Sequence, residues 1–159
     1  MPANNRDFIF SILFLCAVFC AGKAKGQAKS SIGIGAALNT SKENSQGFGA
    51  LFQGEIKLAK SVSLVPSVGG EVAYGIYAGL AGRYYFNPTF YVSAGSFANY
   101  NGDDGSGFGA TGGVGFILMS THRQTIDLNL HGDYLEYKHR SAPVAGVRLI
   151  YSFSFTRLN

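Results

Sequence analysis

The stretch that decides the fold is residues 74–100, YGIYAGLAGRYYFNPTFYVSAGSFANY, in which two alternating runs flank a tight turn at residues 87–89. Side chains of a β-strand point to opposite faces in turn, so each run presents two faces. One face is apolar, with side chains such as Ile76 and Leu80, while the other carries glycine, serine, tyrosine and Arg83. The stretch therefore predicts a β-hairpin with two unlike faces.

The polar face of this hairpin has too little charge for a surface that meets water. Solvated protein surfaces contain roughly 25–35% charged residues. The whole chain contains 14%, against roughly 25% in ordinary soluble domains. If the sheet closes into a small barrel, bulky apolar side chains point outward into lipid, while glycine and a few polar groups fill the narrow interior. The composition therefore predicts a membrane β-barrel.

The same alternation recurs along the chain. Pro66 cannot donate to a β-ladder, so we expect a bulge or a broken strand there, followed by a bend at Gly69 and Gly70. The strands average roughly ten residues, the length that a tilted strand needs to cross a bilayer. The predicted fold is an all-β, closed, antiparallel up-and-down transmembrane barrel of about eight strands. The strands are predicted at residues 29–38, 47–58, 62–71, 74–86, 90–100, 107–119, 125–137 and 144–155.

The N-terminal region has the features of a secretory signal. Arg6 precedes an uncharged apolar run at residues 8–21, and small residues follow it. The run has the length of a signal-peptide apolar region, roughly 7–15 residues. It is too short for the alternative, an uncleaved anchor helix of roughly 20 residues. We predict a signal peptide at 1–28, cleaved between residues 22 and 28, and a barrel domain at 29–159.

Cysteine content and charge exclude two classes of function. Cys16 and Cys20 both lie in the predicted signal peptide, so the mature chain would have no disulfide or thiol chemistry. Removal of residues 1–28, which contain three basic residues and one acidic residue, lowers the net charge from +4 to +2. That excess is too small to indicate binding of nucleic acid.

Charged side chains of both signs fall on the predicted inward face. An unpaired buried charge costs several kcal/mol, and a barrel of about eight strands is just wide enough for side chains to fill it. We therefore expect a paired polar network that plugs the lumen, with a proton or ion path as the alternative. The network is predicted to comprise Glu55, Arg83, Asp127, His131, Asp133 and Arg148.

The basic stretch Lys138, His139 and Arg140 is a candidate contact for lipopolysaccharide phosphates or a protein partner, or else an ordinary charged cap. His139 and Ser141 are also similar to the His-x-Ser pair of the outer-membrane lipid A deacylases. In that pair a carboxylate further along the chain orients the histidine. No Asp or Glu follows Ser141, so we predict that the protein is not an enzyme, with a lipid hydrolase as the weaker alternative.

The histidines lack the spacing of a metal site. His122, His131 and His139 fall in a predicted turn, a strand and a loop. The acidic loop at 101–107 lacks the regular Asp spacing and final Glu of a calcium-binding loop. We therefore predict no metal and no cofactor.

The export signal, the alternating strands and the aromatic last strand at residues 151–155 resemble the small outer-membrane β-barrel family of OmpX and the OmpA transmembrane domain. The family's terminal aromatic assembly signal is followed here by residues 156–159. The resemblance implies an outer-membrane location in a Gram-negative-type cell envelope, with lipid and lipopolysaccharide around the barrel. It also implies insertion by the barrel-assembly machinery and a structural or surface-interaction role. Because residues 29–159 are all assigned to the barrel, we expect no peptidoglycan-binding module such as that of full-length OmpA.

By the same resemblance, the longer connections face the cell surface and the short turns face the periplasm. The surface loops would be 39–46, 70–73, 101–107 and 138–143, and the turns 59–61, 87–89 and 120–124. The main alternative from another class is a soluble periplasmic barrel that binds an apolar ligand. That barrel would turn bulky side chains inward, namely Phe48, Phe52, Tyr84 and Phe116.

Overall fold

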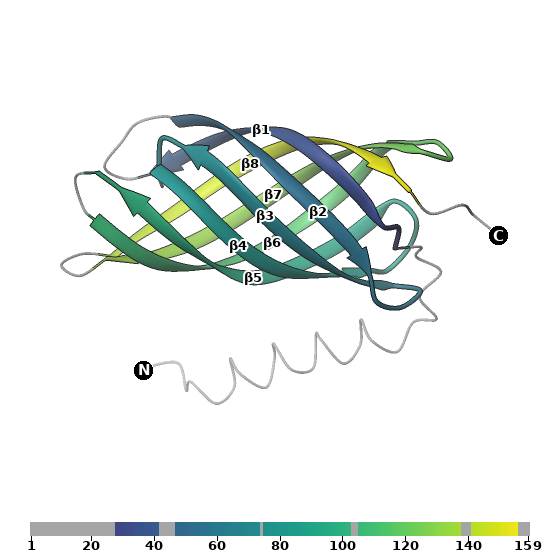
Figure 1. Cartoon of the computed structure of the whole chain (residues 1–159), viewed down its shortest axis with the longest axis horizontal. Coiled ribbons are helices and arrows are strands. Elements are labelled where there is room, and N and C mark those ends of the chain that lie inside the picture. Colours follow the sequence, from purple (N-terminus) through teal and green to yellow (C-terminus); the bar gives the residue numbers. More distant parts are fainter. Residues whose placement is uncertain (1–27, 42–46, 74, 103–104, 138–140, 156–159) are drawn as a thin grey trace, which may run out of the picture.

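The computed structural model describes residues 28–41, 47–73, 75–102, 105–137 and 141–155. Eight antiparallel strands follow one another around a closed barrel, in which β8 pairs with β1 (Figure 1). The predicted all-β barrel is therefore confirmed. The strands are β1 (Ser31–Ser41), β2 (Gly47–Lys57), β3 (Val62–Glu71), β4 (Gly75–Tyr85), β5 (Phe90–Asn101), β6 (Gly105–Ser120), β7 (Gln124–Tyr137) and β8 (Ser141–Ser154).

The two ends of the barrel differ in their connections. We call the end with the short turns after β2, β4 and β6 the turn end, and the opposite end the loop end. The described chain begins and finishes at the turn end, where the Ala28 amide donates to the Lys60 carbonyl (2.9 Å) and the Phe155 amide to the Ser30 carbonyl (3.0 Å). The predicted signal peptide lies outside the described residues except for Ala28. No helix among the described residues is long and apolar enough to span a membrane.

Three strands extend further toward the loop end than predicted. β1 continues to Ser41, β6 begins at Gly105 and β8 begins at Ser141, so the loops predicted at 39–46, 101–107 and 138–143 are shorter. Asn39, predicted to lie in a loop, pairs with Gly47 on one side and Gly146 on the other. A residue typical of turns stays in the ladder here because its side chain is buried and has a polar partner in the lumen.

The predicted break of the strand at Pro66 is wrong, because β3 runs unbroken with Pro66 opposite Leu80 of β4. The pairing of β3 with β2 is interrupted beside the proline, between the pairs Gln53–Ser67 and Ile56–Leu64, but it resumes in the same register and forms no bulge. A proline removes only one donor from a ladder, so β3 can continue past Pro66 in the same register. Gly69 and Gly70 continue the pairing with β4 and form no bend.

A shift of register among the described strands lies elsewhere. The register between β6 and β7 shifts between Ile117 and Met119, near the turn end. Two residues of one strand then face one of its partner, which is the definition of a β-bulge. Nothing in the alternating pattern of β6 predicted this shift.

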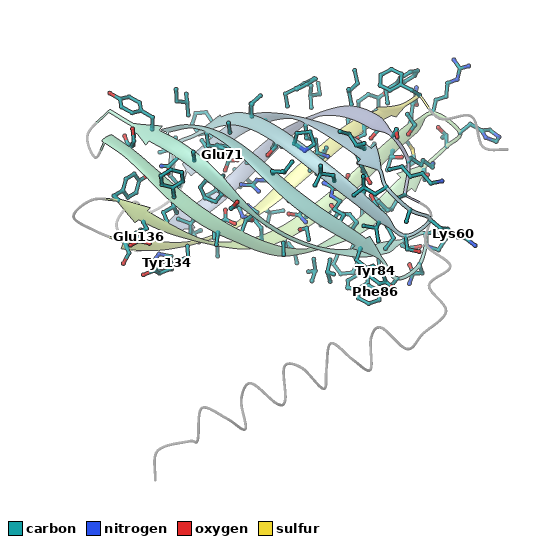
Figure 2. The ribbon with its side chains drawn as sticks, turned by 60° about the horizontal axis from the view of Figure 1, so that its bottom comes forward. Lys60, Glu71, Tyr84, Phe86, Tyr134 and Glu136 are labelled. Carbon is teal, nitrogen blue, oxygen red and sulfur yellow. The ribbon has the colours of Figure 1, made fainter. Side chains whose placement is uncertain are left out.

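The outward face of the barrel is apolar, as the alternation predicts. Phe48 is 75% exposed, Phe52 48% and Phe116 39%, and Figure 2 shows Tyr84 and Phe86 pointing away from the barrel at the turn end. The inward orientation that the soluble alternative requires for these side chains is therefore wrong. Among the described strand residues, the outward positions carry one charged side chain, Glu136, close to the loop end.

The inward face contains more aromatic side chains than the predicted interior of glycine and a few polar groups. These rings fit because they lie on glycines of the neighbouring strands. A Cβ on Gly115 would lie 1.9 Å from the Tyr91 ring, and a Cβ on Gly109 would lie 2.3 Å from the Phe97 ring. The buried aromatic residues of the lumen are Tyr77, Tyr85, Tyr91, Phe97 and Tyr137.

Candidate functional site in the barrel lumen

Arg83 lies at the centre of a polar group in the turn-end half of the lumen. It comes from an inward position of β4, while Glu55 comes from β2, and the two side chains meet with Arg83 Nη1 and Glu55 Oε2 3.1 Å apart. Arg83 Nη2 donates to Gln53 Oε1 at 3.2 Å, and the guanidinium lies 4.5 Å from the centre of the Tyr91 ring. The guanidinium is therefore paired, hydrogen-bonded and stacked although it is only 5% exposed.

Hydroxyl donors complete this group. Glu55 Oε1 accepts hydrogen bonds from the Ser63 and Tyr85 hydroxyls, each at 2.6 Å. Asp127 Oδ1 accepts one from the Tyr91 hydroxyl at 2.6 Å. Buried carboxylates need such donors, because a buried charge without partners is costly. We call this group the turn-end network; it comprises Gln53, Glu55, Ser63, Arg83, Tyr85, Tyr91 and Asp127.

A second group surrounds Glu71, which points into the barrel from the end of β3 (Figure 2). Glu71 Oε1 accepts from the Tyr77 hydroxyl at 2.7 Å and from Arg148 Nε at 3.2 Å. Its other oxygen accepts from the Asn39 amide. Tyr77 and Arg148 also lie close to each other, with the guanidinium 5.8 Å from the ring centre.

Arg148 connects Glu71 to a second acid. Its Nη2 lies 3.5 Å from Asp133 Oδ2, and the same oxygen lies 2.9 Å from His131 Nδ1. Arg148 of β8 thus links an acidic side chain of β3 to an acidic side chain of β7. We call this group the loop-end network; it comprises Asn39, Glu71, Tyr77, His131, Asp133 and Arg148.

The structure places all of the predicted inward residues in the lumen, but in two networks rather than one. The turn-end network holds Glu55, Arg83 and Asp127, and the loop-end network holds the other members of the predicted set, His131, Asp133 and Arg148. Between the networks lies a cavity of about 60 Å³ whose lining includes Gln53, Arg83, Asn129 and Arg148. Lys138, His139 and Arg140 lie outside the described residues.

Sequence reasoning missed Glu71 and the tyrosine hydroxyls. Ser63 and Glu71 are an even number of residues apart, so they share the inward face if the strand is continuous. Because we expected a break at Pro66, the sequence did not assign Glu71 to that face. The inward positions of Tyr77, Tyr85 and Tyr91 were predicted, yet nothing in the alternation assigns a carboxylate to each hydroxyl. The tyrosine hydroxyls donate hydrogen bonds to Glu71, Glu55 and Asp127 in addition to those that the two arginines provide.

Within the described residues, no group of three His, Cys, Asp or Glu side chains is placed to hold a metal ion. His131 and Asp133 resemble the orienting pair of a hydrolytic triad, but His131 Nε2 is buried and has no partner in the described part of the chain. Ser141, the serine of the His-x-Ser pair, is exposed at the start of β8.

Comparison with known proteins identifies the fold. No family model and no curated protein matches the chain. A designed transmembrane β-barrel is similar with a TM-score of 0.55 and 11% identity, over 80% of this chain and 98% of that one. The N-terminal β-barrel domain of OprF from Pseudomonas aeruginosa is similar with a TM-score of 0.52 and 22% identity, over 80% and 100% of the two chains. The attachment invasion locus protein Ail of Yersinia pestis gives a TM-score of 0.49 and 13% identity, over 81% and 99%.

Proposed function

Because the chain has the fold of the small outer-membrane β-barrels, we propose that it is an integral outer-membrane protein with a structural or surface-interaction role and a lumen plugged by side chains. One observation carries this proposal: the outward face is apolar over most of the length of the strands, while the ion pairs Arg83–Glu55 and Arg148–Glu71 lie inside the barrel. A barrel in water requires the opposite distribution, with charged groups outside.

The outward face supports insertion into lipid. Its exposed side chains include Ile34 at 62% and Leu38 at 68%, and each would lose contact with water in a bilayer. At the turn end, neighbouring aromatic rings form a continuous row, with centroids 5.0 Å apart for Tyr84 and Phe86 and 5.4 Å apart for Phe86 and Phe90. Aromatic girdles of this kind mark the membrane interface of outer-membrane barrels.

The lumen supports a plug rather than a pore. Each network joins side chains from different strands, and the ion pairs within it favour charges that hold one another over charges that line an open path. The loop-end half contains in addition a cluster of buried apolar and aromatic side chains. Its members are Ala37, Leu51, Tyr77, Phe97, Leu135, Tyr137 and Val144.

We propose that the turn end faces the periplasm and the loop end the cell surface, as in other barrels with short periplasmic turns. Export through the signal peptide at 1–28 and insertion by the barrel-assembly machinery belong to the same proposal. Lipid surrounds the barrel, and the basic residues Lys138, His139 and Arg140 would contact lipopolysaccharide phosphates at the surface rim. No enzymatic step is part of this function.

Cell fractionation combined with gel mobility tests the membrane assignment. The protein should appear in the outer-membrane fraction, and unboiled and boiled samples should run at different apparent sizes. Recovery in the periplasmic extract would contradict the proposal.

Conductance tests the plug separately. In planar bilayers the purified protein should show no steady open conductance, because the two networks fill the lumen. A stable open level in most insertions would refute the plug while leaving the membrane assignment intact.

A further inference from the structure

A recess of about 450 Å³ lies at the turn end of the lumen, below the turn-end network. One wall is polar and consists of inward positions of β7, β8 and β1, including Thr125, Ser152 and Ser31. The opposite wall is formed by Tyr85, Pro88 and Ile117, and is aromatic or aliphatic. We call this recess the vestibule; its two unlike walls suit a ligand that has both a polar and an apolar part.

Asp127 lies at the inner end of the vestibule with an incomplete set of hydrogen bonds. The carboxylate lines the vestibule and its residue is 1% exposed. Within the described residues its one hydrogen bond is that from Tyr91 to Oδ1, so Oδ2 has no donor. A carboxylate oxygen that faces a recess without a donor is a strong acceptor for a ligand that enters the vestibule.

A second polar group without a partner lines the same vestibule. Ser154 is 3% exposed, and its Oγ is buried with no hydrogen-bond partner in the described part of the chain. Ser154 lies opposite Ser31 across the β1–β8 ladder, and Asp127 lies opposite Ile150 of β8. Ile150 and Ser154 are four residues apart in β8. At about 3.3 Å per residue, Asp127 and Ser154 are therefore about 13 Å apart along the direction of the strand.

The cations near the vestibule are engaged elsewhere. Arg83 is paired with Glu55, and the Lys29 ammonium is held at the rim by Ser120 Oγ (2.9 Å) and the Thr121 carbonyl (3.1 Å). Partial burial lowers the pKa of Lys29, and the charge of nearby Glu55 opposes that shift. Two carboxylates, Glu55 and Asp127, thus face one guanidinium and one ammonium, and Asp127 Oδ2 is the oxygen that these two cations leave without a donor among the described residues.

The chemistry of the free acceptors selects the kind of cation. A bound metal ion would need several carboxylate or histidine ligands, and no group of three such side chains is placed for this among the described residues. A primary ammonium instead offers three donors on a compact head. A ligand with one such head and a hydrocarbon stem could lie along Tyr85 and Ile117 and extend toward Ser154.

We propose that the vestibule binds a linear primary amine with a polar far end, whose ammonium donates to Asp127 and whose polar end bonds Ser154. The stem lies against the Tyr85 and Ile117 wall. This site depends on the geometry of the barrel interior and not on the role of the loops, so it stands apart from the surface-interaction function.

A suitable probe is 6-amino-1-hexanol, added to the isotope-labelled protein purified from membranes in detergent and followed through its backbone amide resonances. Saturable shifts are expected at the turn-end positions of β7 and β8, around Asp127 and Ser154. The diol 1,6-hexanediol, which lacks the ammonium, should give no saturable shifts, and n-hexylammonium, which lacks the hydroxyl, should bind more weakly. Equal binding of the diol, or shifts confined to the loop end or the outward face, would overturn the proposal.

Two variants locate the site. Asp127→Asn should weaken binding of the probe by about tenfold or more, the loss expected when a hydrogen bond to a charged group is removed. Ser154→Ala should weaken binding by about two- to tenfold, as expected for a neutral hydrogen bond. Glu136→Gln, at the opposite end and outside the barrel, is the matched control and should leave binding unchanged.

The same gel-mobility assay shows whether each variant has folded. If Asp127→Asn does not fold, Ser154→Ala and the comparison of the three probes decide the question, because neither requires the loss of a buried charge. Unchanged affinity in a folded Asp127→Asn protein, or in Ser154→Ala, would overturn the proposed contacts.

Discussion

At the loop end of the lumen, Glu71 and Asp133 share Arg148 under a cluster of buried apolar side chains, whereas at the turn end Glu55 and Asp127 lie around Arg83 next to an open vestibule. Each half thus contains two carboxylates and one guanidinium. What differs is the surroundings of the charges: packed side chains at one end, space for water or a ligand at the other. The same ionic groups therefore seal one end of the lumen and line a recess at the other.

Replacement of each arginine should lower the free energy of unfolding more than the other substitutions, and by different amounts at the two ends. Arg148→Met leaves two buried carboxylates without their shared cation, and breaking a buried ion pair costs about 3–5 kcal/mol. Arg83→Met should cost less, because Glu55 and Asp127 line the vestibule, which water can enter, whereas the side chains of Glu71 and Asp133 are fully buried. Urea unfolding of the protein in lipid vesicles, followed by gel mobility, measures both. An equal or larger loss for Arg83→Met would show that the vestibule gives its carboxylates no access to water.

Glycine substitutions test how tightly each half is packed. Gly115→Ala places a methyl group 1.9 Å from the Tyr91 ring, which Asp127 and Arg83 hold in place, so we expect a loss of about 1–3 kcal/mol from overpacking. Gly109→Ala meets the Phe97 ring at 2.3 Å, but that ring has no hydroxyl to hold it by a hydrogen bond and packs against Tyr77 within the apolar cluster. It can shift, and the loss should be smaller.

The control for both substitutions is Gly112→Ala. Gly112 faces outward, and a Cβ there would have no heavy atom within 4 Å. Its unfolding free energy should change by less than about 0.5 kcal/mol, as for surface sites without special features. If Gly109→Ala destabilises the barrel more than Gly115→Ala, the apolar half is the more rigid of the two, contrary to our expectation.

Much of the fold was predictable because period-two alternation determines which side of a barrel wall each residue occupies. Arg83 and Leu80 fall on opposite faces of β4 by counting alone, and the low charge of the polar face indicates that lipid lies outside. The strand limits were less predictable. Asn39 has the chemistry of a turn residue, and its place in β1 depends on Glu71, a partner 32 residues away.

The site was predictable only as a set of inward charges. Pairing depends on the register of strands that are distant in sequence, such as the contact between Arg148 and Glu71 across 77 residues. No local pattern shows that contact. Glu71 itself was hidden because a proline in its strand favours an interrupted ladder, whereas the register of β3 against β2 is the same on both sides of Pro66.

Deletion of single hydroxyls tests the same comparison with the smallest expected effect. Tyr77→Phe removes one of three donors to Glu71, whose side chain is fully buried. Because Arg148 and Asn39 remain, we expect a loss of about 1.5 kcal/mol, the lower end for a hydrogen bond to a charged group.

Tyr85→Phe removes an equivalent bond to Glu55, but Tyr85 and Glu55 both line the vestibule. Water entering from the turn end can replace the lost donor, so the loss should stay below about 0.5 kcal/mol, since a bridging water is nearly as good as a direct bond. The two variants delete the same atom from hydrogen bonds of nearly equal length, 2.7 Å and 2.6 Å. A difference between them therefore measures access of water to each half of the lumen, and equal losses would mean that the vestibule is as dry as the loop end.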